Sequence, residues 1–376
     1  MIRLTGPVLT GPEAGPAWVR GGTIHYGAPD GATPRAADGV GYVPALDGEP
    51  SETLDGYVLP GLVDVHCHIG LGADGGVSRE AAEEQALVDR ATGVLLVRDA
   101  GVPVDTRWID ERPDLPRIIR AGQHIARPKR YIRNYAVELE DVSALPEEMA
   151  RQARAGDGWV KLVADWIDRS MGADAVITPL WPADMLRDAV AAAHENGARV
   201  TAHTFSHAAM DALLDAGIDC IEHGTGMDAD HIAEAARRGI PVTPTLLNID
   251  NFTEYAAQGA AKFPAYAEQM LSMHARREDQ LRAFVDAGVQ LLPGSDSGGV
   301  LEHGIIPAEL LRWQEAGIDP ALVVEFATWR ARRFLGAGAL ADGEPADLVV
   351  YAQDPRRDVS VLADPQAVVL RGVRVL

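Results

Sequence analysis

The stretch Pro60–Gly70 reads PGLVDVHCHIG and carries two histidines, His66 and His68, two positions apart in an apolar run. The run has no helical period and is flanked by proline and glycine, so it predicts a β-strand over 61–68. Successive side chains of a strand point to opposite faces, which places both imidazoles on one face and Cys67 on the other. Asp64 is in phase with the histidines, and we expect its carboxylate to support an imidazole.

Seven further apolar segments have a similar character and alternate with helical stretches rich in alanine, glutamate and arginine. The strand candidates are 61–68, 93–101, 117–122, 158–166, 198–204, 217–224, 240–246 and 289–298. The helical candidates are 79–91, 146–155, 182–196, 206–216, 228–238, 264–287, 307–316 and 319–335. This alternation predicts right-handed βαβ units with parallel strands, and eight such units favour an α/β fold of the closed (β/α)8 TIM-barrel type.

The two ends of the chain have a different texture. Residues 1–57 contain short strand-like pieces, at 17–27, 41–46 and 51–61, separated by Gly, Pro and Asp turns. The last segment, 343–376, has the same character. We therefore expect 1–57 and 343–376 to join into one small β-sandwich, and 58–342 to form the barrel.

Composition excludes several classes of function. The chain has 376 residues and a formal net charge of −21, which opposes binding to nucleic acid or anionic membrane surfaces. Its apolar runs are far shorter than the ~18 to 20 residues of a membrane span. The N-terminus lacks a signal-peptide pattern, and two distant cysteines give no disulfide framework. A cytoplasmic protein is the simplest prediction.

Four polar residues downstream complete a pattern with His66 and His68. Lys161 lies inside the fourth strand candidate, and His203, His223 and Asp296 end the fifth, sixth and eighth. In a parallel barrel the C-terminal strand ends meet at one face, which is where barrel active sites lie. Imidazole and carboxylate groups are standard ligands of zinc and similar ions. These residues predict a metal site, although each one alone has an ordinary structural explanation.

Lys161 raises a separate question, because a buried ammonium beside a divalent ion is unfavourable. One resolution is a lowered pKa, and another is reaction with carbon dioxide to give a carbamate that can bridge two metals. A lysine stem that snorkels at a strand edge is the plain structural alternative. For Asp296 in PGSDSG the plain alternative is a helix cap or an Asx-turn.

Taken together, these segments resemble the amidohydrolase superfamily, most closely its imidazolonepropionase-like and Xaa-Pro dipeptidase-like branch. The similarity rests on PGLVDVHCH (60–68), VKLVADW (160–166), TAHTFSHAAMDALLDAGIDCIEHG (201–224), LLPGSDSG (291–298) and GEPADLVVYAQDP (343–355). The resemblance implies two divalent metal ions, with zinc expected. It implies that His66, His68 and Asp296 hold one ion, that His203 and His223 hold the other, and that N6-carboxylated Lys161 bridges them.

We interpret the chain as a hydrolase that cleaves an amide-type C–N bond in an N-acyl amino acid, dipeptide, lactam or carbamate. Metal-activated hydroxide is the expected nucleophile, with Asp296 as proton shuttle and His223 assisting at the oxyanion. A deaminase of the same superfamily and a non-catalytic scaffold remain alternatives.

Substrate-binding residues are sought in the loops that follow the strands. The candidates are His124, Arg127, Arg130, Tyr131, Trp166 and His303. The third loop, 121–141, departs from the glycine-rich turn of the family and is strongly basic. Its arginines either capture a substrate carboxylate or form a solvated surface. A small-molecule substrate, with an anionic group as a hypothesis, is the expected partner, and homo-oligomerisation stays open.

Overall fold

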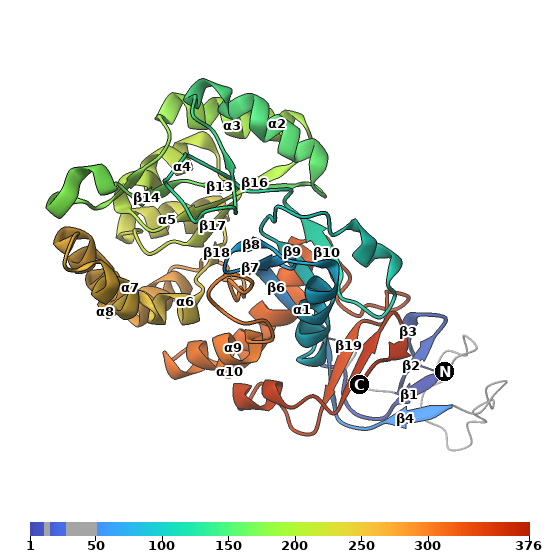
Figure 1. The fold of residues 1–376 in the computed structure, drawn as a ribbon. Helices are drawn as coiled ribbons and strands as arrows, with labels where there is room; N and C mark the ends of the chain where they lie inside the picture. The colour runs from blue at the N-terminus through green and yellow to red at the C-terminus, as the bar shows by residue number, and fades with distance from the viewer. Residues whose placement is uncertain (11–15, 28–50) are drawn as a thin grey trace, which may run out of the picture.

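The computed structural model describes residues 1–10, 16–27 and 51–376 (Figure 1). The strand-like piece expected at 41–46 lies outside these residues. Among the described helices, none is long and apolar enough to cross a membrane.

Parallel strands form the centre of the molecule in two sheets. One sheet has the order β10-β9-β6, and the other has the order β12-β11-β13-β16-β17-β18. The bounds are β6 (Leu62–Cys67), β9 (Val94–Asp99), β10 (Arg117–Arg120), β11 (Ile125–Ala126), β12 (Val137–Glu138), β13 (Trp159–Val163), β16 (Arg199–Thr204), β17 (Cys220–His223) and β18 (Val242–Thr243). Seven of the eight predicted strands are therefore present within their expected ranges.

The eighth predicted strand, 289–298, is an irregular segment that makes only isolated bridges to its neighbours. Leu292 N donates to Val242 O at 2.9 Å on one side, and His68 N donates to Ser297 O at 2.9 Å on the other. Asp296 has a positive φ of 57°, which breaks the pleat of a regular strand. The expected closed barrel is thus only partly realised, because the two sheets do not form one continuous ladder.

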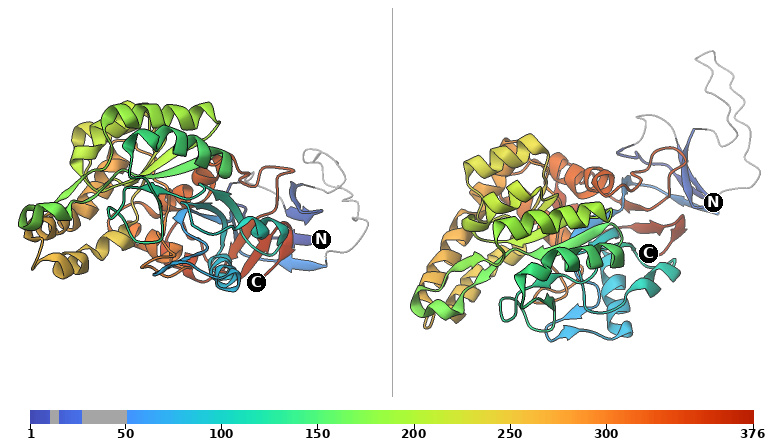
Figure 2. Two further views of the ribbon diagram at one scale, coloured as in Figure 1. Left: turned by 45° about the horizontal axis from the view of Figure 1, so that its top comes forward. Right: turned by 90° about the horizontal axis from the view of Figure 1, so that it is seen from above.

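Helices surround these strands, as Figures 1 and 2 show. Their bounds are α1 (Arg79–Ala91), α2 (Leu145–Ala155), α3 (Ala183–Glu195), α4 (Met210–Ala216), α5 (Ala229–Arg238), α8 (Pro264–Asp286), α9 (Ile306–Glu315), α10 (Pro320–Glu325) and α11 (Ala331–Phe334). A π-helical turn, η5 (Phe326–Arg330), joins the last two. Each predicted helix is present, and α1 matches its predicted bounds because Ser78 caps it through Ala81 N at 3.3 Å.

Several short elements near the strand ends have no counterpart in the sequence prediction. They are β7 (Leu71–Gly72), β8 (Gly75–Gly76), η1 (Arg107–Glu111), η2 (Val142–Ala144), β14 (Asp165–Ile167), η3 (Arg169–Asp174), β15 (Ile177–Pro179), α6 (Leu246–Asp250), α7 (Phe252–Gly259) and η6 (Val359–Ala363). Such elements span too few residues for a hydrophobic period to reveal them. Among them, the β14–β15 hairpin, η3 and α7 help to wall the site.

The two ends of the chain lie side by side (Figure 1). One four-stranded sheet contains β1 (Ile2–Leu4), β2 (Ala17–Arg20), β3 (Thr23–Tyr26) and β4 (Glu52–Leu54), and another contains β5 (Tyr57–Pro60), β19 (Leu348–Tyr351), β20 (Ala367–Leu370) and β21 (Val373–Arg374). Leu4 and Val19 of the first sheet share an apolar cluster with Val58 and Val350 of the second. N- and C-terminal segments therefore bury one common core.

Candidate metal centre

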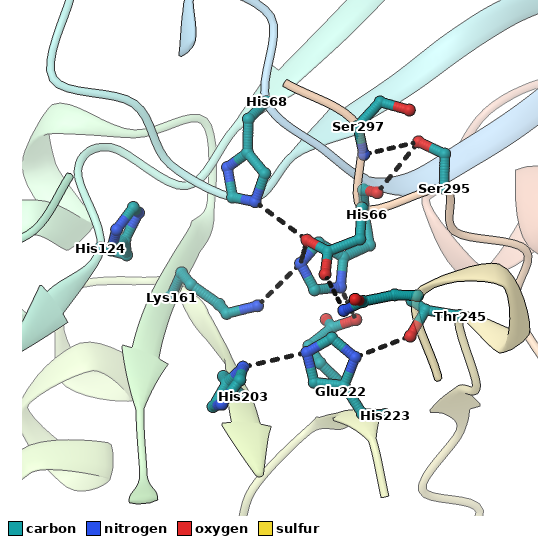
Figure 3. A network of polar contacts seen from close by, with 12 residues as sticks. His66, His68, His124, Lys161, His203, Glu222, His223, Thr245, Ser295 and Ser297 are labelled. Carbon is teal, nitrogen blue, oxygen red and sulfur yellow. Dashed lines mark hydrogen bonds and ion pairs between the residues drawn. The ribbon is translucent and has the colours of Figure 1, made fainter. Parts of the chain in front are cut away.

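Six polar side chains meet at the C-terminal ends of the central strands, and we call them the ligand cluster. They are His66, His68, Lys161, His203, His223 and Asp296, of which Figure 3 labels the first five. Asp296 Oδ1 lies 3.1 Å from His66 Nε2 and 3.5 Å from His68 Nε2. Lys161 Nζ lies 3.2 Å from the same His66 nitrogen. The strand-end pattern in the sequence therefore predicts residues that are close together in space.

His203 and His223 form the other half of the ligand cluster. His203 Nδ1 lies 3.0 Å from His223 Nε2, and His223 Nδ1 lies 2.7 Å from the hydroxyl of Thr245. His203 Nε2 is buried and has no hydrogen-bond partner within the described residues. Buried polar atoms normally have a partner, so this nitrogen is available to bind one.

Two members of the ligand cluster have unusual backbone conformations. His223 and Asp296 have φ values of 66° and 57°, in the left-handed region that costs a non-glycine residue about 1 to 3 kcal/mol. Gly298 also has a positive φ, and a Cβ there would lie 2.4 Å from His68 O. The glycine after Ser297 therefore lets the segment approach β6 closely.

Polar groups on the far side of the rings face two of the histidines, through a hydrogen bond at His68 and a charged contact at His66. Gly101 O accepts from His68 Nδ1 at 2.9 Å, and Glu222 Oε2 lies 2.9 Å from His66 Nδ1. With Nδ1 of each ring facing these partners, both Nε2 atoms face Asp296. Asp64, expected to support an imidazole, instead accepts from His66 N and from Ser295 Oγ, at 3.1 and 2.5 Å. The register of β6 is irregular after Asp64, so strict alternation fails there.

Glu222 is a central residue that sequence reasoning missed. Its buried carboxylate accepts from Arg98 Nη2 and Thr201 Oγ1, and it contacts His66. Strand alternation places Glu222 and His223 on opposite faces, but the positive φ of His223 lets both reach the centre (Figure 3). Arg98 and Glu222 interrupt apolar strands as Lys161 does, and this signal could have identified them.

The electrostatics of the ligand cluster favour a cation. Burial lowers the pKa values of His68 and His203, and it lowers that of His223 to about 3, so these imidazoles are neutral and keep a free lone pair. Burial alone would raise the pKa of Asp296, but the charges and hydrogen bonds of His66 and His68 hold it well below its usual range. Ligand atoms of His66, His223 and Asp296 all lie within 4.8 Å of one another. This donor set suits a divalent metal ion.

A cavity of about 400 Å³ opens above the ligand cluster, and we call it the mouth cavity. His68, His203 and Asp296 form part of its lining. Its aromatic lining residues are Tyr131, Tyr135, Trp166, Phe205, Tyr255, Phe263 and Tyr266. The structure therefore brings two predicted substrate-binding residues, Tyr131 and Trp166, to the site.

The other four predicted substrate-binding residues have different surroundings and are not among the residues that line the mouth cavity. Arg130 donates to Thr178 Oγ1 at 2.7 Å and pairs with Asp168, and the guanidinium of Arg127 lies over the Trp181 ring. His303 Nδ1 lies 2.8 Å from Asp89 Oδ2, which ties its loop to α1. His124 is buried, with its ring centroid 5.2 Å from that of Tyr131.

Replacing Glu222 is expected to destabilise the protein strongly. Glu222→Ala leaves the fully buried Arg98 guanidinium without its carboxylate, a change that costs about 3 to 5 kcal/mol. Urea unfolding in the presence of a chelator measures this loss without a contribution from metal binding. Glu234→Ala, which removes the partly exposed partner of Arg237 at the surface, is the control and should cost less than about 1 kcal/mol. Equal losses in the two variants would contradict the prediction.

Comparisons with known proteins identify the family. The sequence matches the Amidohydrolase family over residues 57–375. Uncharacterized protein Rv2915c of Mycobacterium tuberculosis is 51% identical over 317 residues, which cover 84% of this chain and 85% of that protein. The structure resembles that of a Xaa-Pro dipeptidase with bound methionine (TM-score 0.76, 23% identity, 96% of this chain and 94% of that chain). It also resembles Aspergillus niger ochratoxinase (TM-score 0.75, 16% identity, 99% and 94%).

These two likenesses show a fold of the TIM-barrel type with α/β content. The family match spans the central strands, the ligand cluster and the C-terminal strands. The resemblance predicted from the strand-end motifs is therefore confirmed. This chain belongs to the Amidohydrolase family and is a hydrolase that acts on carbon–nitrogen bonds.

Proposed function

We propose that the chain is a binuclear metal-dependent hydrolase that cleaves an amide-type C–N bond in a small molecule. The observation that carries this proposal is the ligand cluster, in which buried nitrogen and carboxylate atoms converge beside the mouth cavity. Each of its members comes from a different part of the chain, apart from His66 on β6 and His68 directly after it. Such convergence has no evident structural purpose other than binding a cation.

His66, His68 and Asp296 would hold one metal ion, and His203 and His223 would hold the other. Burial lowers the pKa of Lys161, which makes its neutral amine accessible. The amine would add to carbon dioxide, forming an N–C bond and releasing one proton, and the resulting carbamate would supply oxygen ligands to both ions. When bound, divalent ions supply Lewis acidity and lower the pKa of water, and zinc is the expected metal.

Asp296 is the proposed proton shuttle, which accepts a proton from the attacking water and delivers it to the leaving nitrogen. Its low pKa supplies the ionised form that the first transfer needs. Asn248 Nδ2 donates to Asp296 Oδ2 at 2.6 Å and thereby fixes the orientation of the carboxylate. We further propose that His223 helps to stabilise the oxyanion, and that the hydroxyl of Thr245, beside His223 Nδ1, orients the ring.

The finer architecture is part of the same proposal. We infer that β6, β9, β10 with β11, β13, β16, β17, β18 and the irregular segment 289–298 are the eight strands of a TIM barrel. Their order around the axis and the hydrogen bonds of Leu292 and Ser297 support this reading. The two terminal sheets would be the small β-sandwich, from 1–57 and 343–376, beside a barrel of 58–342. Cytoplasmic location and homo-oligomer formation stay predictions.

Metal removal and replacement test the proposed activity. The purified chain is expected to contain about two equivalents of divalent metal and to lose hydrolysis of its amide substrates when a chelator removes them. Restoring zinc should return the activity. Retained hydrolysis in the metal-free chain would refute metal dependence. Ammonia release from the substrate, measured in the same assay, would instead favour the deaminase alternative.

A further inference from the structure

We propose that the substrate carries a bulky, uncharged aromatic or alicyclic group next to its scissile amide, and that the mouth cavity receives this group. This inference rests on the proposed function and assigns a substrate class to the same site. It starts from the position of the mouth cavity, whose floor contains His68, His203 and Asp296. A group that fills the cavity is therefore adjacent to the reacting bond.

Aromatic and aliphatic side chains form most of the wall of the mouth cavity. Tyr131 and Trp166 pack edge to face with ring centroids 4.8 Å apart, and Trp166 lies 5.5 Å from His203. The ring centroids of Phe205 and His203 are 4.4 Å apart, and Tyr266 of α8 lines the same cavity. Aromatic walls in this arrangement favour an inserted ring through apolar burial and edge-to-face contacts.

The charged residues that line the mouth cavity argue against a substrate carboxylate buried inside it. Within the described lining, Arg169 is the one guanidinium or ammonium group, and its side chain is exposed at the rim on η3. Arg127 and Arg130, the sequence candidates for an anion clamp, contact Trp181 and Asp168 instead. Away from the ligand cluster, a buried substrate carboxylate would lack a cationic partner, which makes its desolvation unfavourable.

The elements that wall the mouth cavity contact one another directly, so the cavity is formed without a ligand. The β14–β15 hairpin contributes Trp166, Ile167 and Ile177, and it is joined to α8 where Gln269 Oε1 accepts from Ile177 N at 2.8 Å. Figure 2 shows η3 and α8 extending beside each other at one end of the molecule. A preformed apolar chamber loses little entropy on binding and discriminates by shape.

A matched amide series tests the substrate class. Hydrolysis by the zinc-loaded chain would be measured for a small amide, N-methylacetamide, and for two amides that carry a phenyl ring, N-benzylacetamide and N-methyl-2-phenylacetamide. The two phenyl compounds would also be tested with a carboxylate at the 4-position of the ring. At least one uncharged aryl amide should exceed N-methylacetamide by about 30-fold in kcat/KM, because burial of a phenyl ring favours its transition state. Its carboxylated form should be at least about 10-fold poorer. Equal rates, or a preference for the carboxylates, would overturn the proposal.

Binding without turnover separates this inference from the proposed activity. N-Benzylaniline, an uncharged probe that has no amide, would be titrated into the metal-free chain while tryptophan fluorescence or heat is recorded. Trp166→Ala and, as a milder change, Tyr266→Ala should each weaken binding about 10-fold. Trp108→Ala is the matched control, because Trp108 of η1 contacts Arg79 of α1 and does not line the mouth cavity.

Failure of the proposed activity and failure of the proposed ligand class would give different results. If no amide is hydrolysed but N-benzylaniline binds and Trp166→Ala weakens it, the activity proposal fails and the ligand class stands. If amides are hydrolysed but N-benzylaniline does not bind, or Trp166→Ala and Trp108→Ala behave alike, the ligand class fails and the activity stands.

Discussion

Asp296→Asn is expected to lower kcat by about 10²- to 10⁴-fold, the range in which a positioned acid–base group contributes. Asparagine keeps the shape of the side chain and one carbonyl oxygen, so metal content should remain near that of the unchanged protein. What disappears is the ability to accept a proton. The charges and hydrogen bonds of His66 and His68 hold the pKa of Asp296 well below its usual range against the effect of burial, so the carboxylate is ionised before the transfer.

The measurement is steady-state kinetics paired with metal analysis on the same sample. Asp354→Asn is a suitable control, since Asp354 pairs with Arg356 far from the ligand cluster and should leave both readings unchanged. Full activity in Asp296→Asn would remove the proton-shuttle role. If activity and metal were both lost, the variant would show that Asp296 is needed to bind the metal. It would then give no support to proton transfer by Asp296.

The success of the sequence prediction came from residue types at strand ends. His66 and His68 follow an apolar run, and His203 and His223 lie at the C-terminal ends of β16 and β17. Parallel strands align their C-terminal ends, so position along each strand is enough to place these side chains together. Periodicity also located the helices, and α1 needed only its Ser78 cap to define its start.

The prediction failed where the backbone departs from regular geometry. Segment 289–298 is apolar enough to resemble a strand, but Pro293, Asp296 and Gly298 make it irregular. The same effect concealed Glu222, because the turn at His223 overrides the alternation that strand patterns assume. Left-handed conformations of non-glycine residues leave no signal in composition or period.

Side-chain partners across the fold were also beyond sequence reasoning. The basic third loop suggested an anion clamp, but Asp168 and Thr178 hold Arg130, and these partners lie more than thirty residues away along the chain. The mouth cavity likewise depends on α8 meeting β15 through Gln269. Contacts of this kind depend on the conformations of long loops, which no local sequence pattern predicts.

Lys161→Ala is expected to abolish activity and to reduce metal content below about two equivalents per chain. Residues that merely support metal ligands are worth about 10- to 100-fold in metal affinity or activity. A lysine that bridges two ions as a carbamate should exceed this range. Its buried amine lies 3.2 Å from His66 Nε2, so the substitution removes a group from the centre of the ligand cluster.

The variant also offers a test of the carbamate itself. Removing the Lys161 side chain leaves space beside His66, where acetate or propionate could supply the missing carboxylate oxygens, and added acid should restore part of the activity and metal content. Lys262→Ala, which alters an exposed lysine outside the mouth cavity, should be unaffected in every reading.

Labelling extends the test to the unchanged protein. Metal-free chain reloaded with zinc in ¹³C-bicarbonate should show one carbamate carbon by NMR, whereas reloading in carbon-dioxide-free buffer should leave activity low until bicarbonate is added. The carbamate signal should be absent in Lys161→Ala and present in Lys262→Ala. If Lys161→Ala kept two metal ions and normal turnover, the bridging role of Lys161 would be wrong. If the unchanged protein were fully active without bicarbonate or a carbamate signal, the lysine would act through its neutral amine, the other resolution that its burial allows.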